Sequence, residues 1–170
     1  MSVVYLGLGS NLGDRVSYLR AALDLLIASG EVAIRAVSSL YETAPMHIAD
    51  QPAFLNGAVE VQTGLSPLAL LHLLKETEQA VGRVQRVRYG PREVDLDILL
   101  YDDITVRNHE LTIPHPRLAE RAFALVPLKE IAPGLLLPGT GASLASLIPA
   151  ALALGSVDLV QGPEWYGVGS

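Results

Sequence analysis

Apolar residues recur with two different periods along the first hundred residues of the chain. Alternating or continuous apolar stretches, which are typical of strands, occupy residues 3–8, 32–41, 54–62 and 94–101. Helical spacing appears twice between them. The first helix is expected from the N-cap Asp14 to Gly30. The second is expected from the Ser66-Pro67 cap to about Val81.

The resulting order, β-α-β-β-α-β, is that of a ferredoxin-like α/β (α+β) fold. Two helices should cover one face of an antiparallel sheet. Beyond residue 101 we expect a hairpin-like stretch near 104–113, a turn at 114–116 and short helical pieces. The predicted domain spans residues 1–155. The Gly-rich tail, 156–170, is expected to be irregular, with Trp165 and Tyr166 covering a hydrophobic surface.

Strand parity separates two sets of side chains, because neighbouring residues of a strand point to opposite faces. The apolar sets should pack on the helices: Leu55, Val59 and Val61 in one strand, and Val94, Leu96, Ile98 and Leu100 in the last. Phe54, Asn56, Asp95 and Asp97 should then share the open face. An aromatic ring, an amide and two carboxylates on one open face predict a small-molecule site.

Composition narrows the function classes. The 170 residues carry a net charge of -6, which gives no reason to expect a nucleic acid or a membrane as partner. The chain contains no Cys, and its first residues lack the basic and apolar regions of a signal peptide. The apolar stretch at 134–154 is interrupted by Pro and Gly and cannot span a membrane as one helix. We expect a cytoplasmic monomer.

The Asp95-Leu96-Asp97 pair is the sharpest chemical feature. Two carboxylates at positions i and i+2 of a strand point the same way, roughly 7 Å apart at Cα. Such a pair suits Mg²⁺, which takes oxygen ligands and keeps waters and substrate phosphates. An isolated pair would more often be a solvated polar face. The adjacent segment changes this preference, because Arg83, Arg86, Arg88 and Arg92 fall within ten residues.

Guanidinium groups bind phosphate oxygens, and carboxylates beside several of them are typical of phosphoryl transfer. A solvated basic loop, or arginines paired with Glu78 and Glu93, is the alternative. Pro114-His115-Pro116 with Arg121 forms a second candidate group, since a neutral His can donate a hydrogen bond to phosphate or ribose. A structural role for His115 is the alternative.

The glycines at residues 7–13 do not match the dinucleotide-binding fingerprint, because Leu12 occupies its sixth position, and no P-loop motif occurs in the sequence.

Three segments resemble one family. YLGLGSNLGD at the start, GPREVDLDILLY in the middle and LTIPHPRLAERAF near residue 117 match the 6-hydroxymethyl-7,8-dihydropterin pyrophosphokinases, and YETAPM and DQPAFLN add support. The resemblance covers about residues 2–150. It implies transfer of pyrophosphate from ATP to the pterin hydroxymethyl group in folate biosynthesis. Tyr89 stands where the family often has Trp, and Ala44 where Pro is frequent.

The resemblance also implies roles for individual residues. Two Mg²⁺ ions would be held by Asp95 and Asp97, and the transferring phosphates would be neutralised by Arg83 and Arg92. ATP would further contact Lys75, Glu78, Ile98, His115 and Arg121. The pterin would lie between Phe54 and Phe123, with Thr43, Pro45, Met46, Asn56 and Tyr89 also contacting it. Two other functions stay open on the sequence alone: a non-catalytic ligand-binding domain of the same topology, and a metal-assisted phosphohydrolase.

Overall fold

The structure is a computed structural model that describes residues 1–43, 53–82 and 93–167. Its order begins β1 (Ser2–Ser10), α1 (Arg15–Ala28), β2 (Val32–Val37), β3 (Leu40–Thr43), β4 (Phe54–Thr63), α2 (Pro67–Val81) and β5 (Asp95–Tyr101). The predicted strand at 32–41 is divided into β2 and β3 at Ser38-Ser39, and both parts pair with β4. The predicted βαββαβ order is therefore confirmed.

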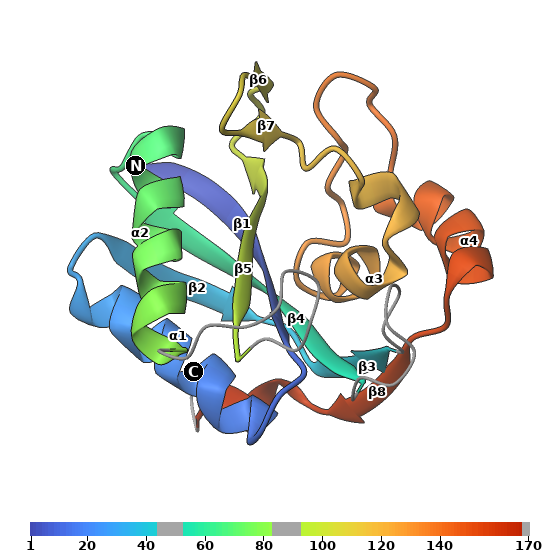
Figure 1. The fold of residues 1–170 in the computed structure, drawn as a ribbon. Coiled ribbons are helices and arrows are strands. Elements are labelled where there is room, and N and C mark those ends of the chain that lie inside the picture. Colours follow the sequence, from blue (N-terminus) through green and yellow to red (C-terminus); the bar gives the residue numbers. More distant parts are fainter. Residues whose placement is uncertain (44–52, 83–92, 168–170) are drawn as a thin grey trace.

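The sheet is antiparallel, with the order β5-β1-β4-β3-β8 and β2 also on β4; β8 is the late strand Asp158–Gln161 (Figure 1). Helices α1 and α2 cover one face. Both begin with capping side chains: Asp14 accepts from Ser17 N, and Ser66 accepts from Ala69 N. Leu6 and Leu8 of β1 are buried there against Leu19 and Leu23 of α1 and Leu74 of α2. The main core thus lies between the sheet and these two helices.

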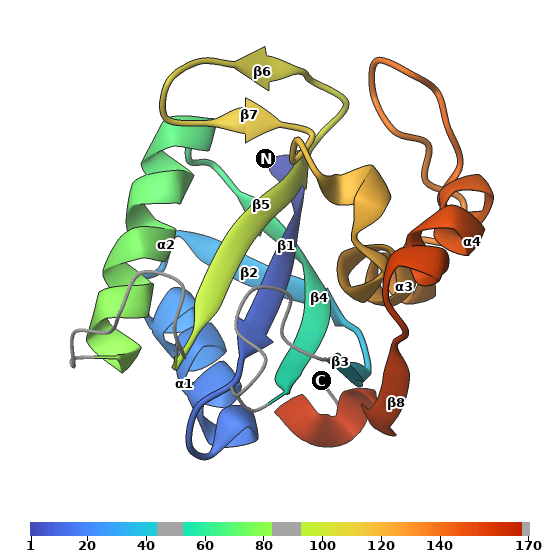
Figure 2. The ribbon, with the colours of Figure 1, turned by 45° about the vertical axis from the view of Figure 1, so that its right-hand side comes forward.

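The second half of the chain adds smaller elements. They are β6 (Val106–Arg107), β7 (Thr112–Ile113), the 3-10 helix η1 (Leu118–Glu120), α3 (Ala122–Ile131), α4 (Leu144–Leu154), β8 (Asp158–Gln161) and the 3-10 helix η2 (Pro163–Tyr166). Figure 2 shows the β6-β7 hairpin beyond the end of β5, and α3 and α4 on the opposite side of the sheet from α1 and α2. No described helix is long and apolar enough to cross a membrane.

Helices α3 and α4 cover part of the second face of the sheet, which the prediction left open. They form a second hydrophobic cluster that includes Leu99, Leu125, Leu128 and Leu144. Leu100 also belongs to this cluster, not to the α1–α2 face predicted by simple alternation. The reason is an irregularity in the β1–β5 pairing: Tyr5 pairs with Leu100 but Leu6 with Ile98, so Leu99 is an extra residue that reverses the parity.

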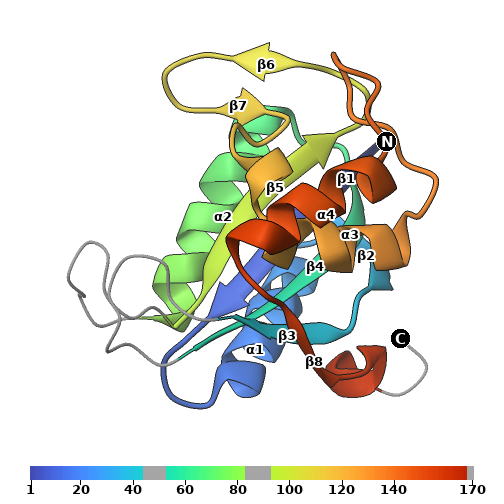
Figure 3. The ribbon, with the colours of Figure 1, turned by 90° about the vertical axis from the view of Figure 1, so that its right-hand side faces the viewer.

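The predicted irregular tail is also corrected. Strand β8 pairs antiparallel with β3, and η2 follows it (Figure 3). Trp165 is completely buried in the main cluster, and its Nε1 donates to Ser38 O at 2.8 Å. Tyr166 donates from its hydroxyl to Asp24 of α1 at 2.8 Å. Without β8, the outer edge of β3 would expose unpaired backbone groups. The buried Trp165 indole anchors η2, the segment that follows β8. The expected role of Trp165 as a cover is confirmed.

Candidate functional site

The predicted polar group does come together around the central strand β1. Gly9 pairs with Asn56 of β4 on one side and with Asp95 of β5 on the other. Gly7 pairs in the same way with Ala58 and Asp97. We call the surface formed by Gly7, Gly9, Asn56, Asp95 and Asp97 the site face. It lies on the side of the sheet opposite α1 and α2, beside α3.

Gly9 lies between Asn56 and Phe54 on one side and Asp95 on the other. A methyl group added at its Cα would lie 3.1 Å from Asn56 Oδ1, and 3.9 Å from both Asp95 Cβ and Phe54 Cδ1. Gly9 therefore separates an amide and aromatic half of the face, with Asn56 and Phe54, from a carboxylate half, with Asp95 and Asp97. The side chain of Leu99 covers Gly7, where a methyl group would lie 3.2 Å from Leu99 Cδ2. Sequence reasoning missed the role of Gly9, although the alternation in YLGLGS places both glycines opposite the apolar Leu6 and Leu8.

The amide half is ordered by a hydrogen bond between adjacent strands. Asn56 Nδ2 donates to Thr43 Oγ1 at 2.9 Å, and Asn56 is 5% exposed. Since its Nδ2 is engaged by Thr43, its Oδ1 remains directed over Gly9 as an acceptor. Phe54, the first residue of β4, is partly exposed beside it. The structure thus brings three of the predicted pterin residues into one group.

The carboxylate half is supported from α2. Glu78 Oε2 accepts from Leu96 N at 2.7 Å, which is the backbone amide between Asp95 and Asp97. Lys75 Nζ lies 3.6 Å from Glu78 Oε1. The pKa of Glu78 is raised to about 7: burial is the main cause and the charges of Asp95 and Asp97 add to it, while the Leu96 hydrogen bond and Lys75 oppose the rise. Three carboxyl groups therefore share this edge of the sheet.

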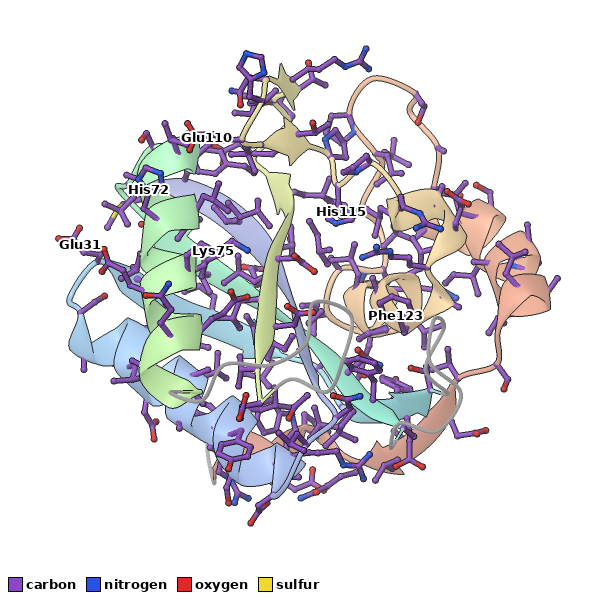
Figure 4. The ribbon with its side chains drawn as sticks, viewed as in Figure 1. Glu31, His72, Lys75, Glu110, His115 and Phe123 are labelled. Carbon is purple, nitrogen blue, oxygen red and sulfur yellow. The ribbon has the colours of Figure 1, made fainter. Side chains whose placement is uncertain are left out.

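Across the site face, Arg121 supplies positive charge. Burial lowers the pKa of its guanidinium group, and the negative charges of Asp97 and Asp95 act against that shift. Its Cζ lies 5.5 Å from the ring centroid of Phe123, at the start of α3. Helix α3 packs on β3 and β4, so Arg121 and Phe123 enter the site from the side opposite α2. In Figure 4, Lys75 lies on one side of β5, and His115 and Phe123 lie on the other.

His115 is neutral at physiological pH. Burial, together with the charges of Arg121 and Arg117, lowers its pKa to about 4. Its Nδ1 accepts from Arg117 N at 3.3 Å, so the ring hydrogen is on Nε2. The backbone N of His115 is bonded to Leu99 O at 3.0 Å, which ties this segment to β5. The predicted neutral donor is therefore consistent with the local geometry.

One predicted ATP contact, that of the Ile98 side chain, is not part of this group. Ile98 is 3% exposed and its side chain lies in the main core, so a contact with ATP could involve only its backbone. Pro45, Met46, Arg83, Tyr89 and Arg92 lie outside the described residues. Glu93, which follows them, is 8% exposed, and a methyl group at Gly82 would approach its Oε2 to 2.7 Å. Sequence reasoning gave Glu93 no part beyond a possible ion pair.

The residues present fit a magnesium site that ATP would complete. Asp95 and Asp97 both face the site, and Asp95 pairs with Gly9, which places no side chain beside it. Within residues 1–43, 53–82 and 93–167, no three His, Asp or Glu side chains form a metal-binding group by themselves. A two-carboxylate donor set matches Mg²⁺, which keeps several waters and takes substrate phosphates as ligands.

Together these features define a class of protein: a ferredoxin-like domain with a cluster of acidic and aromatic side chains on its sheet. Residues 5–133 match the profile of 7,8-dihydro-6-hydroxymethylpterin-pyrophosphokinase (HPPK). The chain belongs to this family, and it is a pyrophosphokinase by class.

Named relatives agree with the family match. The chain is 48% identical over 130 residues to the 2-amino-4-hydroxy-6-hydroxymethyldihydropteridine pyrophosphokinase of Bacillus subtilis, covering 76% of this chain and 78% of that one. It is 43% identical over 154 residues to the enzyme of the same name from Methylorubrum extorquens. That match covers 89% of this chain and 98% of the relative. Both relatives are matched over most of their length, so the resemblance is to whole enzymes.

A solved structure shares the fold. The crystal structure of wild-type Plasmodium falciparum HPPK-DHPS with pteroate superimposes with a TM-score of 0.73 at 17% identity. The match covers 89% of this chain but 44% of that one. At this level of identity the comparison supports the fold alone.

Proposed function

We propose that this chain transfers the β,γ-diphosphate of ATP to the hydroxymethyl group of 6-hydroxymethyl-7,8-dihydropterin on the site face. The observation that carries the proposal is the position of Gly9, whose surroundings bring Asn56 and Phe54 within reach of Asp95. A pterin held by the first two would direct a substituent toward the carboxylates. The acceptor hydroxyl and the phosphates would then meet above β1.

Pterin recognition is assigned to the amide half. The Oδ1 of Asn56, fixed by the bond to Thr43, would accept from the N–H groups at the amide edge of the pterin. Phe54 and Phe123 approach from β4 and α3 and would stack on the two faces of the ring. Pro45, Met46 and Tyr89 are proposed to complete this half. The recognition is neutral, which suits an uncharged bicyclic ring.

Phosphate recognition is assigned to the carboxylate half. Asp95 and Asp97 would hold two Mg²⁺ ions, with ATP phosphate oxygens and water completing the coordination. Mg²⁺ held by these two aspartates would neutralise phosphate charge and lower the pKa of the attacking hydroxyl. Arg121 and the Nε2–H of His115 would donate to the phosphates from the α3 side, and Lys75 from the α2 side. Arg83 and Arg92 are proposed to neutralise the transferring group.

The proposed transfer forms one O–P bond and breaks another. The pterin hydroxyl oxygen attacks the β-phosphorus and forms the new O–P bond, while the bond from that phosphorus to the α,β-bridging oxygen breaks. AMP departs with the bridging oxygen, and the hydroxyl proton passes to solvent water. Glu78 would act indirectly, because its bond to Leu96 N fixes the strand segment that carries both aspartates. Positioning and charge neutralisation supply most of the catalysis in such transfers.

The test is AMP formation from ATP in four mixtures, with Mg²⁺ and the pterin each present or omitted. The proposal predicts AMP only when both are present. AMP or phosphate released without pterin would indicate a phosphohydrolase. A folded protein that binds pterin but forms no AMP would indicate a non-catalytic binding domain.

A further inference from the structure

Arg15 makes an unusual pair of contacts for the first residue of a helix. Its Nη1 donates to Glu42 Oε2 at 2.7 Å and to Ala53 O at 2.9 Å. One nitrogen therefore joins β3 to the residue that precedes β4. A cation in the first turn of a helix opposes the helix dipole, which costs about 0.3–1 kcal/mol. The position of this arginine is not explained by the needs of α1.

The two partners of Arg15 flank the last residue pair of the β3–β4 ladder. Glu42 precedes Thr43, and Ala53 precedes Phe54; Thr43 and Phe54 are paired. The end of a ladder is where local opening costs least. Both members of this end pair belong to the amide half of the site face, and Thr43 holds Asn56. Arg15 is thus one residue away from each group that orients the proposed pterin site.

Global stability does not account for these contacts. The side chains of Arg15 and Glu42 are 28% and 40% exposed, and ion pairs at such positions contribute on the order of 0–1 kcal/mol to unfolding. The local effect is different, because one guanidinium group crosses the gap between two strand ends and limits their separation.

We propose that Arg15 is a positioning residue for the pterin substrate. By joining Glu42 to the Ala53 carbonyl, it holds the Thr43–Phe54 pair closed and so keeps Asn56 Oδ1 and the Phe54 ring in their binding geometry. This inference rests on the proposed function, and it assigns Arg15 no contact with ATP, metal or pterin. Its effect should therefore appear in pterin affinity and not in the chemical step.

The experiment compares wild type with Arg15→Ala, Arg15→Lys, Glu42→Gln and the matched control Arg35→Gln, an exposed arginine of β2. KM for pterin at saturating ATP, KM for ATP at saturating pterin, kcat and Tm are measured for each. Arg15→Ala should raise the pterin KM about three- to tenfold, the size expected for loss of a charged hydrogen bond at a partly exposed site. KM for ATP, kcat and Tm should change little. Arg15→Lys should recover part of the loss, and Arg35→Gln should match wild type.

The contrary outcomes are distinct. An unchanged pterin KM in Arg15→Ala would overturn the inference, as would equal increases in both KM values. A loss of activity that follows a large fall in Tm, and appears also in Arg15→Lys, would mean that Arg15 is structural. A wild-type protein that forms no AMP would instead refute the proposed function. Pterin affinity would then be measured directly by calorimetry, and equal affinities of wild type and Arg15→Ala would still refute the inference.

Discussion

Replacing Glu78 with glutamine should stabilise the ligand-free protein in a strongly pH-dependent way. The side chain of Glu78 is 16% exposed, and its pKa rises from 4.5 to about 7 on folding. Because the folded state holds this proton more tightly, folding is opposed as pH rises from about 4.5 to 7. A glutamine carries no charge, and its amide oxygen can still accept from Leu96 N.

The magnitude follows from the two pKa values. A difference of about 2.5 pH units at about 1.4 kcal/mol each corresponds to roughly 3 kcal/mol above pH 7, and to less than about 1 kcal/mol at pH 5. Glu78→Gln should therefore raise the unfolding free energy by about 2–3 kcal/mol more at pH 8 than at pH 5. With Mg²⁺ and a non-hydrolysable ATP analogue bound, nearby cations favour the carboxylate and the gain should shrink.

Urea unfolding at pH 5, 6, 7 and 8, without metal or nucleotide, measures this difference. Glu76→Gln is the matched control, because Glu76 is exposed on the same helix. A gain of equal size at all four pH values would refute the reasoning, since it would not come from the ionisation of Glu78. The same pH-dependent gain in Glu76→Gln would refute it as well, because it would reflect net charge.

Further predictions concern the site face, the C-terminal segment and assembly. Asp95→Asn and Asp97→Asn should each reduce kcat by at least about a hundredfold with Tm nearly unchanged, because both carboxylates face outward from the sheet; near-normal kcat would exclude them as metal ligands. Gly9→Val should raise the pterin KM at least about tenfold, as its Cβ would meet Asn56 Oδ1 at 3.1 Å; normal pterin binding by this variant would place the pterin elsewhere. Trp165→Ala should lower the unfolding free energy by about 3–5 kcal/mol in urea titrations, and a loss below 1 kcal/mol would show that η2 is not anchored. Light scattering should give the mass of a monomer, and a dimer mass would contradict that expectation.

The fold could be predicted to a large extent because its first hundred residues carry strong periodic signals. The helices start at capping residues, and the strands that flank them alternate clearly, so the βαββαβ order followed directly. Parity placed Asn56, Asp95 and Asp97 on one face correctly, because β4 and the first half of β5 are regular. The same rule was wrong for Leu100, since the extra residue at Leu99 depends on pairing with β1 and has no local sequence signal.

The remaining features depend on contacts between distant parts of the chain. Strand β8 has four residues and forms because β3 offers an edge, while Trp165 finds its place 127 residues from Ser38. Helices α3 and α4 were expected only as short pieces, and their cover over part of the second face could not be inferred from apolar content. Glu78 was assigned by family resemblance, and Arg121 was also singled out beside the His115 turn. Their approach to Asp95 and Asp97 from opposite sides is a property of the tertiary structure.

The most direct test of the central claim is a ³¹P NMR spectrum of the products formed from ATP, Mg²⁺ and 6-hydroxymethyl-7,8-dihydropterin. The proposed placement of the pterin hydroxyl opposite the β-phosphorus predicts equal amounts of AMP and a pterin diphosphate ester. Formation of ADP with a pterin monophosphate, or of inorganic phosphate or pyrophosphate with unchanged pterin, would contradict it.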